Sequence, residues 1–287
     1  MNSPSPSPSP RARLRHALLR IGAGRHAPEA DLRTDLECAL SELAEEMLGE
    51  RSRVGSVTLG SADHTWGRNL GLRLADHDVG LPNLLWRADG SALPARVRET
   101  HPALRQDEWE AALLVGKLIL TVLESEPAPD PDPGRNPDPD PVRDKAVPHP
   151  QRLPRPARAP GRESFCRSLT AIVEHGNPQD ELTALLRTTL LAFASETPDN
   201  QEAAHHIAVL STAPPQPAMR LCLSRSGLSL GQVLLSADGC PVPGSVLEEF
   251  PDLNQDEWNA VMHVTGLVLS AFETEPANAA GRLPHST

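Results

Sequence analysis

The 287-residue sequence is poor in aromatic side chains, lysine and cysteine, and the shortages of aromatic residues and cysteine each exclude a class of site. With four tryptophans, four phenylalanines and no tyrosine, the core must be aliphatic, and a base-stacking platform for single-stranded nucleic acid is disfavoured. Lysine occurs twice, and all other Lys or Arg positions are arginine. The cysteines Cys38, Cys166, Cys222 and Cys240 form no C-x-x-C pair, so neither a zinc site nor a disulfide framework is predicted. This cysteine usage favours a reducing, cytoplasmic location.

Long apolar runs and catalytic motifs are also missing. The longest apolar run, residues 111–123, contains Lys117 and predicts no transmembrane segment. The N-terminal stretch around Leu18 and Ile21 is too short and too basic for a secretory signal. No phosphate-binding loop, nucleophile elbow, zinc-protease motif or glycine-rich dinucleotide turn occurs. We therefore predict no catalytic residue, no metal and no cofactor, and keep an enzyme of unrecognised class as an alternative.

Charge and proline divide the chain into segments. Residues 1–28 hold five arginines and no acid, whereas residues 29–126 carry a net charge of −8 and residues 163–287 one of −10. Acidic folded segments repel a phosphate backbone, which disfavours nucleic-acid binding. Residues 127–162 contain 12 prolines in 36 positions, many in Asp-Pro pairs, and predict a disordered linker. Residues 1–28 predict a disordered basic arm, and residues 281–287 a flexible tail.

A shift of the chain against itself by 149 residues reveals an internal repeat. Between residues 84–127 and 233–276, 20 of 44 positions are identical without a gap, which predicts a duplication. Its signature residues are Asp107, Glu108 and Trp109 in the first copy and Asp256, Glu257 and Trp258 in the second.

The pattern predicts an α+β fold of two tandem modules, residues 29–126 and 163–280, each with a helix, a three-stranded antiparallel sheet and a helix. The expected helices are 31–47 and 106–124 in the first copy, and 180–195 and 255–273 in the second. The expected strands are 54–60, 69–75 and 83–88, then 206–211, 219–224 and 231–237.

The acidic residues of the signature suit the start of a helix. The pairs Asp107-Glu108 and Asp256-Glu257 fall in the first turn, where carboxylates complement the helix dipole. Asn254 and Glu257 have the spacing of a capping box. The first copy has Arg105 in place of Asn254 and must be capped differently.

The repeated helix has more apolar surface than one small sheet can cover. The surplus predicts that the two copies pair as the protomers of a twofold homodimer do, or that each surplus face packs on its own module's first helix. The residues expected at this inter-repeat or partner interface are Leu114, Val115, Leu118, Val122, His263, Val264, Leu267 and Ala271. The acidic and histidine groups Asp63-His64 and Asp76-His77-Asp78 form a further candidate cluster, in the first copy alone.

In element order, size and acidity, residues 31–126 and 180–276 resemble the effector-binding chaperones of type III secretion. This resemblance implies a non-enzymatic adaptor whose sheet and first-helix surfaces hold a partner polypeptide. The sequence departs from that family by linking two copies in one chain and by lacking further expected strands and a final helix. The alternatives are an immunity or antitoxin-like inhibitor of a basic toxin and a secreted effector with a Ser/Pro-rich export signal.

Overall fold

The computed structural model describes residues 8–22, 29–49, 54–64, 67–77, 79–87, 95–123, 161–175, 180–196, 198–211, 219–236 and 248–273. We call residues 8–123 the first half and residues 161–273 the second half. The predicted linker lies outside the described residues except for 161–162, which begin a helix. The predicted tail, residues 281–287, also lies outside them.

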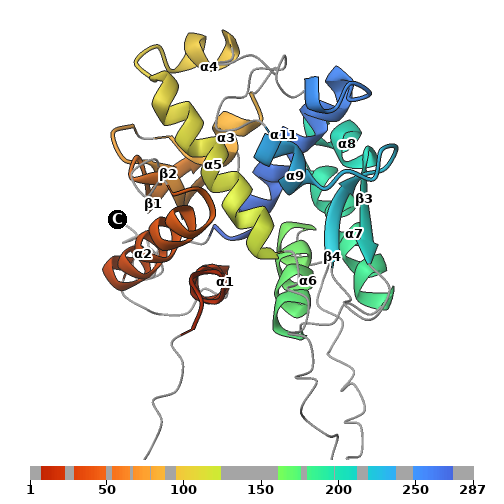
Figure 1. Cartoon of the computed structure of the whole chain (residues 1–287), viewed down its shortest axis with the longest axis horizontal. Helices are drawn as coiled ribbons and strands as arrows, with labels where there is room; N and C mark the ends of the chain where they lie inside the picture. The colour runs from red at the N-terminus through yellow and green to blue at the C-terminus, as the bar shows by residue number, and fades with distance from the viewer. Residues whose placement is uncertain are drawn as a thin grey trace, which may run out of the picture.

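The described chain is mostly helical and contains two separate pairs of strands (Figure 1). The first half consists of α1 (Pro10–Gly22), α2 (Glu29–Leu48), β1 (Val57–His64), β2 (Gly67–Leu74), α3 (Leu81–Leu85), α4 (Ala95–Thr100) and α5 (Gln106–Leu123). The second half consists of α6 (Gly161–His175), α7 (Asp180–Ala194), α8 (Pro198–His205), β3 (Ile207–Ser211), β4 (Met219–Leu223), α9 (Leu230–Ser236) and α11 (Gln255–Ala271).

Each sheet has two strands among the described residues, so the prediction of three-stranded sheets was wrong. β1 pairs antiparallel with β2, with Val57 opposite Leu74, and β3 pairs antiparallel with β4, with Ile207 opposite Leu223. In place of the strand expected at 83–88 the chain has α3, which ends at Leu85, and in place of the strand expected at 231–237 it has α9, which ends at Ser236.

A short apolar run fits a strand and a helix equally well, and the turn residues decide between them here. Leu81, Leu84 and Leu85 are buried at helical spacing, and Pro82 lies in the first turn, where its missing N–H costs nothing. In the second half, Ser229 Oγ accepts a hydrogen bond from Gln232 N (3.1 Å), and Gln232 Oε1 accepts one from Ser229 N (3.2 Å). This reciprocal cap starts α9 as a helix.

The prediction of a disordered arm over residues 1–28 was wrong for residues 10–22, which form α1. Leu14, Leu18 and Ile21 are buried on one face of this helix, a helical spacing that the dense arginines obscured. Arg15 Nη2 donates a hydrogen bond to Val122 O at the end of α5 (2.9 Å). Basic side chains at a helix C-terminus satisfy its free carbonyls, so α1 belongs to the folded first half.

The apolar helices α5 and α11 lie at the centre of the molecule, between the elements of the two halves (Figure 1). Both are buried on nearly all sides. α5 packs against α1 and α2 of its own half and against α9 of the second half, whereas α11 packs against α8 and against α3 of the first half. The continuous core therefore runs through both halves.

Candidate functional site

The residues predicted for an interface lie inside the core rather than on an open surface. Those on α5 and α11 that are fully buried are Leu114, Val115, Leu118, Val122, Val264, Leu267 and Ala271, while His263 is half-buried. The two helices contact each other. Where they meet, a Cβ added to Gly116 would lie 3.0 Å from Thr265 Cγ2. These two residues occupy equivalent positions in the sequence repeat, 149 residues apart.

His263 has packed polar partners on two sides. Its Nδ1 lies 2.6 Å from Oδ1 of the buried Asn200 on α8, and its main-chain oxygen accepts a hydrogen bond from Trp86 Nε1 at 3.2 Å. The indole of Trp86, which ends α3, lies against Gly266, where an added Cβ would be 2.6 Å from Nε1. His263 therefore helps to hold α11 against elements of both halves.

The signature acids cap their helices. Glu257 N donates to Asn254 Oδ1 (2.8 Å), and Asn254 N donates to Glu257 Oε2 (3.1 Å), which confirms the predicted capping box. In the first half, Arg105 N donates to Oε2 of the buried Glu108 at 2.8 Å. Asp107 is exposed, and its hydrogen bond from Arg105 lowers the pKa of its carboxyl. The two signature tryptophans, Trp109 and Trp258, are buried in the core.

A histidine cluster forms beside the start of α5. His77 Nε2 lies 3.1 Å from Glu108 Oε2, and His101 Nε2 lies 3.1 Å from Arg87 Nη1. Glu108 already accepts the hydrogen bond from Arg105 N that caps α5, and Arg87 also donates a hydrogen bond to Thr100 Oγ1. The predicted partners Asp63, His64 and Asp78 have side chains outside the described part of the chain.

His101 makes the stability of the first half depend on pH. Burial, and then the charges of Arg87 and His77, lower its pKa below the ordinary value of 6.5. At acid pH the folded state thus binds fewer protons than the unfolded state. His101 therefore costs no stability above pH 6.5, and the free energy of unfolding decreases as the pH falls below that value. The equivalent position of the second copy is Phe250. We expect His101→Phe to flatten the acid side of a plot of melting temperature against pH. Parallel curves for the two proteins would contradict this assignment.

Sequence reasoning missed a groove between α7 and β3. It is open, has a volume of about 610 Å³ and is lined by Thr183, Ala184, Arg187, Thr188, Leu191, Val209 and Leu210. Leu210 is 43% exposed, unusual for a large apolar side chain of this protein. Arg187 is exposed and forms no ion pair with any described residue. We call this surface the second-half groove.

The corresponding face of the first half is occupied by the chain's own side chains. The buried positions of α2, Leu36, Leu40, Leu43 and Ala44, recur in α7 as Leu186, Leu190, Phe193 and Ala194, 150 residues later. By this alignment Thr183 replaces Arg33, and Arg187 replaces Glu37. Arg33 Nε donates to Leu59 O on β1 (2.8 Å), and Thr58 Oγ1 donates to Glu37. Among the described residues, these two hydrogen bonds join α2 to β1 at the place where the second half has its groove.

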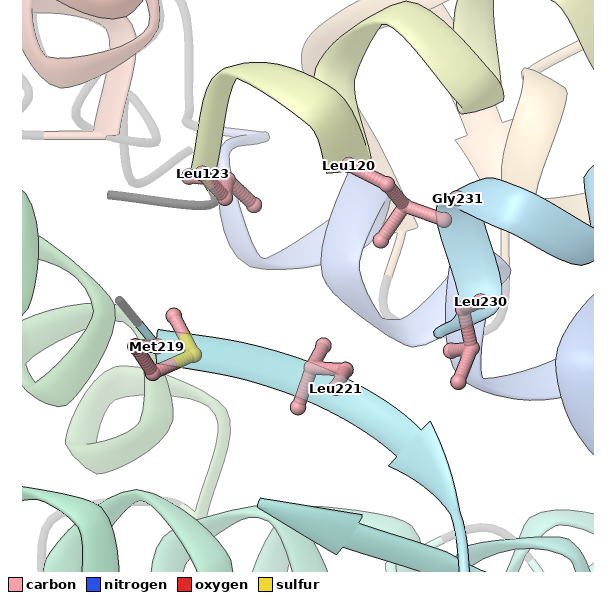
Figure 2. A pocket seen from close by; sticks show the side chains of 6 residues that line it. All are labelled: Leu120, Leu123, Met219, Leu221, Leu230 and Gly231. Atoms are coloured by element: carbon pink, nitrogen blue, oxygen red, sulfur yellow. The ribbon is translucent and has the colours of Figure 1, made fainter. Parts of the chain in front are cut away.

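Two other pockets are less suited to a ligand. A small apolar gap lies between Leu120 and Leu123 of α5, Met219 and Leu221 of β4, and Leu230 and Gly231 of α9 (Figure 2). Its volume of about 10 Å³ admits at most one water, so it is a packing seam between the halves. A pocket of about 320 Å³ between α1 and α2 has His16 and Cys38 on its wall, and the charged side chains Arg13 and Asp35 of its lining are already paired with Glu42 and Arg20.

Within the described ranges, no group of three or more His, Cys, Asp or Glu side chains is arranged to hold a metal ion. None of the helices described is long and apolar enough to cross a membrane. The Cys166 thiol is buried, and burial raises its pKa, which disfavours a nucleophilic role. No family model, curated protein or solved structure matches this chain.

Proposed function

We propose that this protein is a non-enzymatic adaptor that holds another polypeptide on the surface of its second half. The second-half groove is the observation that carries the proposal. It combines the exposed Leu210 with Arg187, which has no ion pair among the described residues, on a face where Arg33 of the first half binds β1. The groove therefore offers a partner polypeptide both an apolar contact, at Leu210, and a charge, at Arg187.

The scaffold in this proposal is a duplication whose two copies pair as a twofold dimer does. In such a dimer, a residue on the symmetry axis contacts its own equivalent, and the contact of Gly116 with Thr265 supports this reading. Two further relations support it. α5 packs on α9, and α11 packs on α3. Since α3 and α9 are equivalent in the two copies, these are the same contact made twice. Arg11 donates to Thr121 O and Arg162 Nε to Ser270 O (2.9 Å), where Thr121 and Ser270 are also equivalent.

The adaptor is proposed to resemble the secretion chaperones in its task rather than in its sheet. The groove combines a helix that precedes the strands with the first strand itself, the surfaces that the resemblance predicted for a partner. A cytoplasmic location forms part of the proposal and is supported by the cysteine usage of the sequence, in which four cysteines form no C-x-x-C pair.

The proposal is tested by isolating the full chain from its native cells together with whatever binds it. We expect one stoichiometric protein partner, identified by mass spectrometry and retained through size-exclusion chromatography. Leu210→Glu is expected to lose it, because a charge replaces an exposed apolar contact. Met47→Glu is the matched control, since Met47 is 36% exposed in the first half. Partner loss with both variants or with neither would count against this surface, and the absence of any partner would defeat the adaptor proposal.

A further inference from the structure

β3 has one edge that no described strand pairs, and this edge lies beside the second-half groove, which Val209 and Leu210 line. Ser224 N donates to His206 O (2.7 Å), and in the register of β3 with β4 this sets the hydrogen-bonded pairs at every second residue. Val209 therefore directs its N–H and C=O away from β4. A strand edge that no described strand pairs is a template for a further strand.

The first half shows what it takes to close such an edge. Ala75 N donates to Ser56 O (2.8 Å), so Leu59, the equivalent of Val209, also directs its main chain outward. Its carbonyl accepts the hydrogen bond from Arg33 Nε. The next residue of the strand, whose side-chain position lies on the face of the sheet, also differs between the halves. A Cβ at Gly60 would lie 2.8 Å from Cδ of Arg73, whose side chain covers that position, whereas Leu210 projects at the same place in β3.

We propose that the second-half groove binds one extended peptide segment as an added strand along β3, with an Asp or Glu of the segment opposite Arg187. This inference rests on the proposed adaptor function and specifies its site. Main-chain pairing to Val209 supplies affinity, and alternate side chains of the segment enter the groove.

The lining of the groove defines the chemistry of the segment. Leu191 and Leu210 offer apolar contact, and Thr183 and Thr188 place hydroxyl groups beside it. Arg187 is the one charged residue in that lining, so a carboxylate on the segment is the complement that gives orientation and specificity. A partner segment therefore alternates apolar residues with an acid and has no proline where it pairs with β3, because proline lacks the N–H that the ladder needs.

The asymmetry of the two halves also sets the stoichiometry. Arg33 and Glu37 occupy in the first half the positions of Thr183 and Arg187, and they already bind β1. A second segment thus finds no equivalent edge. One chain takes one partner segment.

The test uses a displayed library of random twelve-residue peptides, selected against the full chain. The comparison protein is the double variant Thr183→Arg with Arg187→Glu, which transplants the two residues that close the first half. Both positions are at least partly exposed, so the variant is expected to keep the melting temperature of the parent. Selected peptides should contain an acid between apolar residues, bind the parent at a ratio of one to one in calorimetry, and bind the double variant at least about tenfold more weakly.

A single charge reversal sharpens the result. Arg187→Glu should weaken acidic peptides about tenfold and favour analogues with lysine in place of the acid. Peptides that bind the parent and the double variant equally would place the binding site elsewhere and overturn this inference while leaving the adaptor function intact. If neither protein selects any peptide, this inference falls, while the adaptor proposal is decided by the isolation of a partner from native cells. Self-association of the parent that the double variant abolishes would make a second copy the occupant. Peptide binding that appears only after the aspartates of residues 127–160 are changed to asparagine would make that segment the occupant. Either result would also overturn the inference.

Discussion

Replacing Trp109 or Trp258 with alanine is expected to lower the free energy of unfolding by about 3–5 kcal/mol, the usual cost of truncating a buried aromatic side chain. Trp109 is 1% exposed and Trp258 3% exposed, in the first turns of the two central helices. Since ordinary domains are stable by about 5–15 kcal/mol, either variant loses a large part of the total. Because the core is shared by both halves, the loss should appear in the unfolding of the whole chain.

Phenylalanine at the same positions separates packing from hydrogen bonding. Neither indole nitrogen has a hydrogen-bond partner among the described residues. Trp→Phe should therefore cost only the lost volume and remain clearly milder than Trp→Ala. Chemical denaturation monitored by circular dichroism measures both series. Alanine variants that unfold at the same denaturant concentration as the parent would remove these residues from the core.

The parts of the fold that were predictable are those where several local signals agree. Over residues 255–273 the Asn254–Glu257 spacing, the first-turn acids and the apolar periodicity all indicate a helix, and α11 occupies Gln255–Ala271. The same agreement holds for α5. The strand pairs were predictable in outline. The alternating residues 69–75 fall on β2, which begins two residues earlier and ends one residue earlier, and the strand expected at 219–224 exceeds β4 by one residue.

The parts that were not predictable depend on contacts between distant residues. α1 is held by its packing on α2 and α5. No local pattern in this segment, which is rich in arginine and proline, predicts that contact. The second-half groove was hidden because residues 84–127 match residues 233–276 at a spacing of 149, whereas the buried positions of α2 match those of α7 at a spacing of 150. With that one-residue change, the exchange of Glu37 for Arg187 becomes visible in the sequence alone.

The contact between the halves leads to the second large expected effect. When residues 8–123 and 161–273 are produced as separate fragments, we expect them to form a one-to-one complex, because α11 packs on α3 and α5 on α9. Each fragment alone would expose an apolar helix face and should self-associate. Light scattering distinguishes these states.

A substitution at Gly266 tests whether that association uses the observed contact. A side chain there meets the Trp86 indole of the other fragment, with Nε1 at 2.6 Å and Cδ1 at 2.8 Å from an added Cβ. Gly266→Leu should cost about 1–3 kcal/mol, as overpacking of a close contact does, and weaken the complex about tenfold for each 1.4 kcal/mol. Combining it with Trp86→Leu, the residue type found at the equivalent position 235, removes the obstructing ring and should restore part of the affinity.

Calorimetric titration of one fragment with the other measures all four combinations. If the fragments associate equally well with and without Gly266→Leu, the halves do not pair through α3 and α11. If the double variant binds no better than Gly266→Leu alone, the loss arises within α11 rather than at Trp86.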